Sequence, residues 1–143
     1  MKLTKLFLTE FTKRNRGYIL NVASSAGFVP GPLMSGYYAS KAYVVRLSES
    51  IAGELKAMRS NIGISVLCPG PVDTEFNKVA KVNFSIKSLK SEYVANYAVN
   101  KMFKKKLIII PGVRMKLAIF FSRFLPRKLL MKINYNIQTK KEM

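Results

Sequence analysis

Apolar residues recur along much of this chain at spacings of three and four, the pattern of an amphipathic helix. Leu3, Phe7 and Phe11 are the clearest example, since four-residue steps place them on one helix face. The pattern predicts helices over 2–15, 37–58 and 91–105, and two basic helices over 113–143 that are broken near Pro126. Gly17 is expected to cap the end of the first helix, and Ser91 the start of the third.

Short aliphatic runs alternate with these helices and predict strands. They lie at 18–23, 61–68 and 107–110. The first run leads into a loop rich in Ser, Gly and Pro, and Pro69-Gly70-Pro71 ends the second. The segment 73–90 is left open, with at most a short helix. Helices and strands that alternate in this order predict an α/β fold, with a parallel sheet covered by helices on its faces.

The charge of the chain is strongly unbalanced. There are 25 Lys and Arg against 7 Asp and Glu, a formal net charge of +18. Such a surface attracts nucleic acid, acidic lipid headgroups or anionic cofactors. Because no nucleic-acid-binding motif accompanies the charge, we do not expect a nucleic-acid partner.

The residue types present in the chain exclude several kinds of site. The chain has no histidine, and Cys68 is its only cysteine. A disulfide framework and a Cys/His metal site are excluded, and we expect no bound metal. Acid–base catalysis must therefore use Tyr, Lys, Asp or Glu. The cysteine usage, and the lack of any apolar run near the roughly 18 residues that span a bilayer, predict a cytoplasmic protein.

One tyrosine and one lysine form a candidate acid–base pair. Tyr37 and Lys41 lie four positions apart in a predicted helix, which puts both side chains on one face. An ammonium beside a phenol favours the phenolate, so such a tyrosine can exchange a proton near neutral pH. The spacing alone carries little information, because a chain with 7 Tyr and many lysines produces it by chance. Tyr97 and Lys101 form a second such pair, to which we assign no role.

The surrounding motifs make the first pair informative. The strand 18–23 runs into a Ser-rich turn, and Ser24 lies thirteen residues before Tyr37. The next strand ends in the run Pro-Gly-Pro-Val-Asp-Thr over 69–74. In order and spacing these three motifs resemble the short-chain dehydrogenase/reductase family, over about residues 1–112. The resemblance implies a partial Rossmann-type, doubly wound parallel sheet, of which this chain holds the three C-terminal strands with flanking helices.

The resemblance also implies roles for individual residues. Tyr37 would exchange a proton with the substrate oxygen, Lys41 would favour its phenolate and bind the nicotinamide ribose, and Ser24 would hydrogen-bond the substrate oxygen. Ser25 leaves a one-residue ambiguity in the position of the serine. Tyr38 has no lysine four residues later. The nicotinamide end of the cofactor would meet Pro69, Gly70, Val72 and Thr74, and the segment 74–90 would cover the substrate.

The phosphate-binding part of such enzymes has no counterpart in the sequence. No Gly-rich turn of the G-x-x-x-G-x-G kind precedes Ser24. We therefore interpret the chain as a C-terminal catalytic half that lacks the N-terminal nucleotide-binding half. It would be a truncated NAD(P)-dependent oxidoreductase, inactive alone, with NAD and NADP equally open as cofactor. The alternative is a decayed, non-catalytic fragment whose basic surface contacts a membrane or nucleic acid.

The organisation of the chain suggests its partners. We divide it into residues 1–112, the partial Rossmann-type domain, and residues 113–143, a basic amphipathic tail. The tail is expected to pack its apolar face on the sheet or on a partner subunit, with peripheral contact to an anionic membrane as the alternative. A lipid-like carbonyl or alcohol substrate would suit such a tail. Helices 2–15 and 37–58 would join a homodimer or a tetramer.

Overall fold

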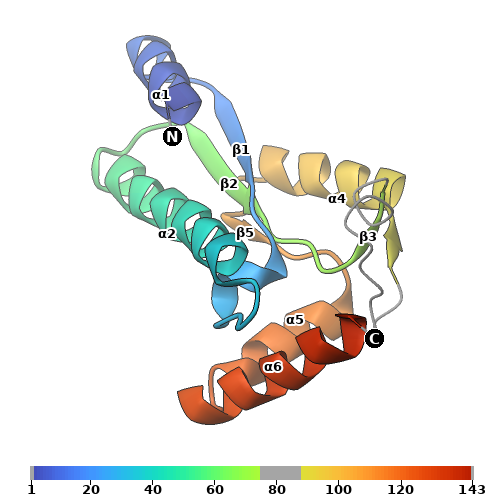
Figure 1. The fold of residues 1–143 in the computed structure, drawn as a ribbon. Helices are drawn as coiled ribbons and strands as arrows, with labels where there is room; N and C mark the ends of the chain where they lie inside the picture. Colours follow the sequence, from blue (N-terminus) through green and yellow to red (C-terminus); the bar gives the residue numbers. More distant parts are fainter. Residues whose placement is uncertain (1, 75–87, 143) are drawn as a thin grey trace.

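The computed structural model describes residues 2–74 and 88–142 of the chain (Figure 1). Helices and strands alternate through most of it, as the hydrophobic pattern predicts. The elements are α1 (Lys2–Arg14), β1 (Tyr18–Val22), the 3-10 helix η1 (Ser25–Phe28), α2 (Ser35–Ala57), β2 (Gly63–Leu67), β3 (Val72–Asp73), β4 (Leu89–Lys90), α4 (Ser91–Phe103), β5 (Ile108–Ile109), α5 (Val113–Ser122) and α6 (Arg127–Glu142).

The main sheet is parallel, with strand order β1-β2-β5. Tyr18 lies opposite Gly63 and Val22 opposite Leu67, while Val66 of β2 pairs with Ile108 of β5. Every residue of the central strand β2 is buried, as expected for a strand covered on both faces. The predicted α/β class and partial Rossmann-type sheet are confirmed.

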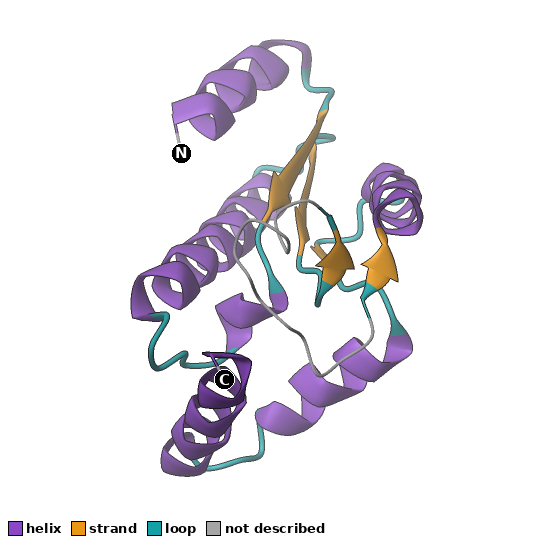
Figure 2. Ribbon diagram, turned by 45° about the vertical axis from the view of Figure 1, so that its right-hand side comes forward, coloured by secondary structure: helices purple, strands orange, loops and turns teal. Residues whose placement is uncertain are grey.

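Helices α2 and α4 cover opposite faces of this sheet (Figure 2). Successive side chains of a strand point to opposite faces, so β2 contributes to both cores. Val66 packs with Val45 of α2, whereas Leu67 packs with Val94 of α4. Val72, in the motif that follows β2, packs with the cluster on the α4 side.

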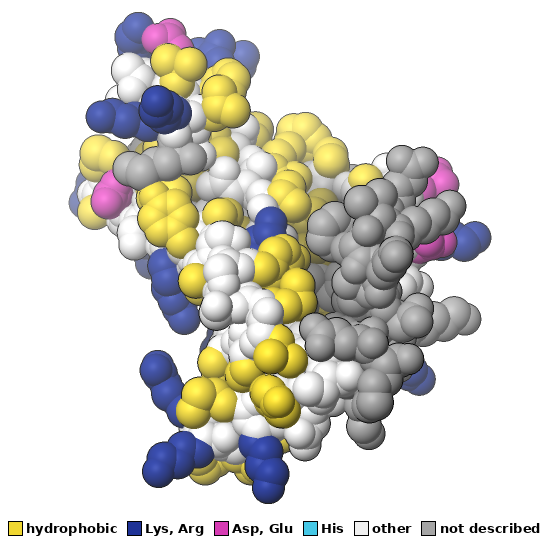
Figure 3. All heavy atoms as spheres, viewed as in Figure 1, with side chains coloured by type: hydrophobic (Ala, Val, Ile, Leu, Met, Phe, Trp, Pro, Cys, Tyr) yellow, Lys and Arg dark blue, Asp and Glu magenta, His cyan; other side chains and the backbone are white. Residues whose placement is uncertain are grey.

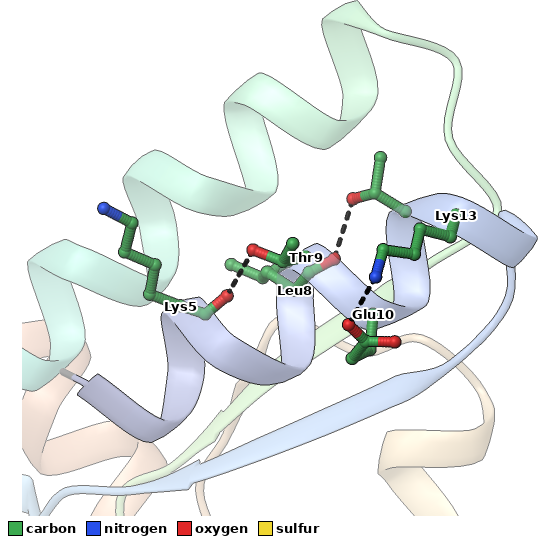
Figure 4. Close-up of polar contacts among 6 residues, drawn as sticks. Lys5, Leu8, Thr9, Glu10 and Lys13 are labelled. Carbon is green, nitrogen blue, oxygen red and sulfur yellow. Dashed lines mark hydrogen bonds and ion pairs between the residues drawn. The ribbon is translucent and has the colours of Figure 1, made fainter.

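Helix α1 is attached mainly through two side chains. Leu8 and Phe11 pack against the buried cluster at the start of β1 and the end of α2. The polar contacts of Figure 4 lie within the helix itself, among them the exposed ion pair of Glu10 and Lys13 at 2.7 Å. An exposed pair of this kind adds little stability. The outer side of α1 leaves apolar side chains in solvent, namely Leu3, Leu6 and Phe7.

Two expected helix caps are wrong. Helix α1 ends at Arg14, and the next residue, Asn15, has a left-handed φ of 46°, so Gly17 does not supply that conformation. Gly17 instead leaves room for Phe11, because a Cβ there would lie 2.2 Å from the Phe11 ring. Ser91 is the first residue of α4 and not its cap; Lys90 precedes the helix without a side-chain cap.

Strand β1 is less buried than its apolar sequence suggests. Tyr18 is 38% exposed and Val22 is 59% exposed, because β1 lies at one edge of the sheet. A second, small parallel ladder joins β3 to β4, pairing Val72 with Leu89. The sequence does not predict this ladder. The expected lid over 74–90 lies mostly outside the described residues, which resume at 88.

The two predicted C-terminal helices are present as α5 and α6, with Pro126 between them. Ile119 of α5 is buried, and Asn134 of α6 donates a hydrogen bond of 2.6 Å to the carbonyl oxygen of Pro30. The tail therefore contacts the loop that precedes α2. In the described part of the chain, no helix is long and apolar enough to cross a membrane. The division of the chain at residue 112 stays a prediction.

Candidate active site

The candidate site lies where β1 and β2 end (Figure 1). Three segments meet there: the Ser-rich turn after β1, the first turns of α2, and the Pro-Gly-Pro turn after β2. The N–H of Ser25 donates a 2.8 Å hydrogen bond to the carbonyl oxygen of Pro69, which joins the two loops. Gly27 is buried against α2, and a Cβ on it would lie 2.9 Å from the carbonyl oxygen of Lys41. Since a larger residue at position 27 would push η1 away from α2, this glycine allows the Ser-rich turn to approach the helix closely.

Ser24 is held in the turn by its own side chain. It occupies the cap position of η1 in an extended conformation, and its Oγ accepts a 3.2 Å hydrogen bond from the N–H of Ala26. Its carbonyl oxygen accepts from the N–H of Gly27 at 3.0 Å. A hydroxyl has one proton to donate. Within the described part of the chain the Ser24 hydroxyl donates it to no acceptor, so it is free for a ligand oxygen.

Tyr37 and Lys41 share one face of the first turns of α2. The Lys41 Nζ lies 5.5 Å from the centroid of the Tyr37 ring, within the range of a cation–π contact. Both side chains are partly buried. Among the described residues, the Tyr37 hydroxyl has no hydrogen-bond partner. The predicted pairing of the two side chains is therefore present in the structure.

The neighbouring Tyr38 has a different environment. Its hydroxyl accepts a 2.7 Å hydrogen bond from Nε2 of the buried Gln138, on α6. Burial raises the pKa of Tyr38, although the Gln138 hydrogen bond acts in the opposite direction. Gly31 packs against the Tyr38 ring so closely that a Cβ there would lie 2.1 Å from it. Tyr38 is thus a fixed structural residue, and Gln138 has no motif by which the sequence could have revealed its role.

The residues predicted to contact the nicotinamide lie in the segment 69–74, which follows β2. Pro69, Gly70 and Val72 are partly buried, and Thr74 is exposed at the end of the described segment. Met115 of α5 lies against Gly70, since a Cβ there would be 2.4 Å from the Met115 Cε. The structure brings this turn next to the Ser24 loop through the Ser25–Pro69 hydrogen bond.

The second tyrosine–lysine pair lies elsewhere. Tyr97 is on α4, which covers the opposite face of the sheet from α2. Its hydroxyl accepts a 3.0 Å hydrogen bond from Lys116, and this bond lowers the pKa of Tyr97. The Lys101 Nζ lies 5.4 Å from the ring centroid. No serine of the Ser24 turn shares this face, so the pair does not reproduce the Tyr37 arrangement.

Comparison with known proteins agrees with this fold and these motifs. A structure from work on 7beta-hydroxysteroid dehydrogenase stereoselectivity superposes with a TM-score of 0.76 at 21% identity, over 92% of this chain and 51% of that one. A short-chain dehydrogenase from Sphingobium yanoikuyae, solved with NADPH, has a TM-score of 0.65 at 25% identity, over 80% of this chain and 46% of that one. The fold class is that of a Rossmann-type dehydrogenase.

The sequence comparisons identify the family. The family model described as short chain dehydrogenase matches residues 1–83, which include every predicted site residue. Human estradiol 17-beta-dehydrogenase 11 is 32% identical over 139 residues, or 96% of this chain and 46% of that protein. The chain belongs to the short-chain dehydrogenase family. It spans about half the length of the curated relatives it matches.

Proposed function

We propose that this chain is the C-terminal catalytic half of an NAD(P)-dependent oxidoreductase that interconverts a carbonyl and an alcohol. The observation that carries the proposal is the contrast between adjacent tyrosines. The Tyr37 hydroxyl is unpartnered among the described residues and has Lys41 over its ring, whereas the Tyr38 hydroxyl is bonded to Gln138. A proton-transfer group must be free to reach the substrate, and Tyr37 meets that condition.

Each residue of the site has a separate task in this proposal. The free hydroxyl proton of Ser24 donates to the substrate oxygen, where negative charge develops during reduction. Tyr37 gives its phenolic proton to that oxygen, or accepts one from an alcohol in the reverse direction. The ammonium of Lys41 places a positive charge 5.5 Å from the centroid of the Tyr37 ring, beside the group that transfers the proton. A nicotinamide cofactor, when bound, would supply or accept the hydride.

The residues fit one end of such a cofactor. Lys41 is a donor suited to ribose hydroxyls, and the turn of Pro69 and Gly70 is hydrogen-bonded to the Ser24 loop beside it. The sequence contains no Gly-rich phosphate-binding turn for the pyrophosphate. We therefore expect the chain by itself to bind NAD and NADP weakly and to turn over little or no substrate.

Substrate, location and assembly are further proposals. One relative carries estradiol in its name and one structural neighbour a hydroxysteroid. With the apolar tail, these names favour a lipid-like carbonyl or alcohol as substrate. The single cysteine, buried next to β2, favours a cytoplasmic location. The exposed apolar side chains of α1 are compatible with a homodimer or tetramer.

The decisive experiment follows NADPH and NADH absorbance with a panel of steroid and acyl ketones. The chain is assayed alone and fused to the nucleotide-binding half of a related dehydrogenase. The fusion is expected to be active, and Tyr37→Phe is expected to lower kcat by at least about a hundredfold, since general acid–base catalysis contributes about that much.

Tyr38→Phe is the matched control, because it removes the same atom from the adjacent residue. It should keep most of the fusion's activity at temperatures where it is folded, because the loss of the Gln138 bond lowers stability but removes no proton-transfer group. Equal losses in the two variants, or a well-folded fusion without activity, would refute the assigned proton-transfer role. Stoichiometric binding of NADPH to the chain alone, with micromolar affinity, would refute the expectation that the chain by itself binds the cofactor weakly.

A further inference from the structure

One side of α5 and the turn after it exposes a continuous apolar stripe. Its members follow helical spacing and are each 49–72% exposed: Val113, Leu117, Phe120, Phe121 and Phe124. The opposite side of the helix faces the protein, where Ile119 is buried and Met115 lies against Gly70. The helix is therefore attached by one face and presents a second, larger apolar face to solvent. Isolated exposed apolar residues are ordinary, but a stripe of three phenylalanines marks an interaction surface.

Cations flank this stripe on both sides. Arg114 lies on one side and Arg123 on the other, by their helical positions. Lys116 lies on the same side as Arg123 but is hydrogen-bonded to the Tyr97 hydroxyl, so it is not counted among the flanking cations. Helix α6 adds Arg127, Lys128 and Lys132. The sequence from 113 to 141 contains no Asp or Glu to neutralise them. In the space-filling view, hydrophobic and basic side chains share the end of the molecule formed by α5 and α6 (Figure 3).

The positive charge beside the stripe indicates which of three partners binds there: a second copy of the chain, nucleic acid or an anionic lipid surface. A second copy would bring the same five cations (Arg114, Arg123, Arg127, Lys128 and Lys132) close to their counterparts, and like charges at an interface oppose association. Nucleic acid would use the cations but would leave the phenylalanine stripe in water. An anionic lipid surface satisfies both parts, since headgroups attract the cations while the acyl boundary accepts the rings.

We propose that α5 docks this protein on an anionic membrane surface, with its phenylalanine stripe at the headgroup–acyl boundary and its flanking cations on the headgroups. The docking is peripheral and independent of the proposed enzymatic function. The opposite side of α5 contacts the Gly70 turn of the candidate site through Met115, so the helix lies between that turn and the docked surface.

The sequence has no tryptophan, so a single introduced one reports on its own surroundings. Phe124→Trp places the reporter in the stripe, where the native side chain is 72% exposed. Phe7→Trp is the matched control, since Phe7 is 49% exposed on α1, at the other end of the molecule (Figure 1). Each variant is mixed with vesicles of phosphatidylcholine alone, and with vesicles that also contain phosphatidylserine.

The expected result for the Phe124→Trp variant is a blue shift of its tryptophan emission with phosphatidylserine vesicles, quenching by brominated acyl chains, and reversal by high salt. The Phe7→Trp variant should show none of these changes. In vesicle co-sedimentation, Phe120→Ser with Phe121→Ser should weaken partitioning about tenfold or more. Arg123→Gln should weaken it about fivefold. Circular dichroism of each variant should match the unchanged chain, because the replaced side chains are exposed.

Other outcomes would overturn the proposal. An emission shift of the Phe124→Trp variant that grows with protein concentration without vesicles identifies a second copy as the occupant. Equal shifts in the Phe124→Trp and Phe7→Trp variants place the contact elsewhere. Vesicle binding that survives the loss of both phenylalanines, and is competed by RNA, shows a general polyanion contact. Absence of binding to phosphatidylserine vesicles refutes the docking itself.

Discussion

Gln138 donates a 2.7 Å hydrogen bond to the hydroxyl of Tyr38, across one hundred positions of sequence. The bond joins α6 to the first turn of α2, where Tyr37 precedes Tyr38. A second contact, from Asn134 to the carbonyl oxygen of Pro30, joins the same helix to the loop before α2. The C-terminal helix thus holds the segment from which the candidate catalytic tyrosine projects.

Removal of this hydrogen bond should destabilise the fold. Tyr38→Phe leaves the buried Gln138 amide without its partner, and we expect the free energy of unfolding to fall by about 1–3 kcal/mol. Urea unfolding measures the change. Thr139→Ala is the control, because the Thr139 hydroxyl bonds to the Tyr135 carbonyl of its own helix. If the two variants are equally stable, the bond does not hold α6 against α2.

Two fully buried serines, Ser48 and Ser65, should respond differently to substitution by alanine. The Ser48 Oγ accepts from Nδ2 of Asn21 at 2.9 Å and donates to the Val44 carbonyl at 2.8 Å. Ser48→Ala removes both bonds and should cost about 1–2 kcal/mol. The Ser65 Oγ has no partner among the described residues, so Ser65→Ala should be neutral or stabilising. Chemical denaturation compares the pair, and an equal loss in both would show that Ser65 has a partner in solution.

Alanine substitutions at Gly27 and Gly53 should change stability in opposite directions. The first tests close packing of η1 on α2, and the second tests helix propensity. Gly27→Ala places a Cβ 2.9 Å from the Lys41 carbonyl oxygen, and the rigid backbone must move, at a cost of about 1–3 kcal/mol. Gly53→Ala adds a methyl group where no atom other than the adjacent residues and backbone of α2 lies within 4 Å, and should stabilise α2 by about 0.5–1 kcal/mol. Thermal unfolding of both variants tests the pair. A tolerated Gly27→Ala would mean that η1 does not pack on α2 as closely as described.

Cys68 should make stability depend on alkaline pH. Burial, with a smaller effect of the nearby Glu49 carboxylate, raises the pKa of the Cys68 thiol from 9.0 to about 12. Because the folded state holds the proton more tightly, this stabilisation is complete below about pH 9 and is lost as pH rises towards about 12. Urea midpoints across this range should fall more steeply for the unchanged chain than for Cys68→Ala. Parallel curves would show that the thiol titrates normally in the folded state.

The same burial should make the thiol unreactive. Cys68 is fully buried in the cluster with Val45 and Val66, and a reagent needs the exposed thiolate. Ellman's reagent should label it only as fast as the protein unfolds. Rapid labelling of the folded chain would contradict this burial.

The sequence determined those features that depend on local spacing. The aliphatic runs at β1 and β2 predicted the strands, and a four-residue step placed Tyr37 and Lys41 on one helix face, because helix and strand periods are properties of neighbouring residues. The order of three motifs identified the family, which the family model over residues 1–83 supports.

Tertiary structure decided the features that depend on residues distant in sequence. It set Asn15 in the left-handed conformation expected of Gly17, and it packed the Phe11 ring against Gly17. It formed the short β3–β4 ladder, which is too brief to show a period of two. It also gave the adjacent Tyr37 and Tyr38 different environments. The Tyr37 hydroxyl has no partner among the described residues, whereas the Tyr38 hydroxyl is bonded to Gln138. No local pattern records such a contact, because its energy arises only when packing brings a residue one hundred positions away into reach.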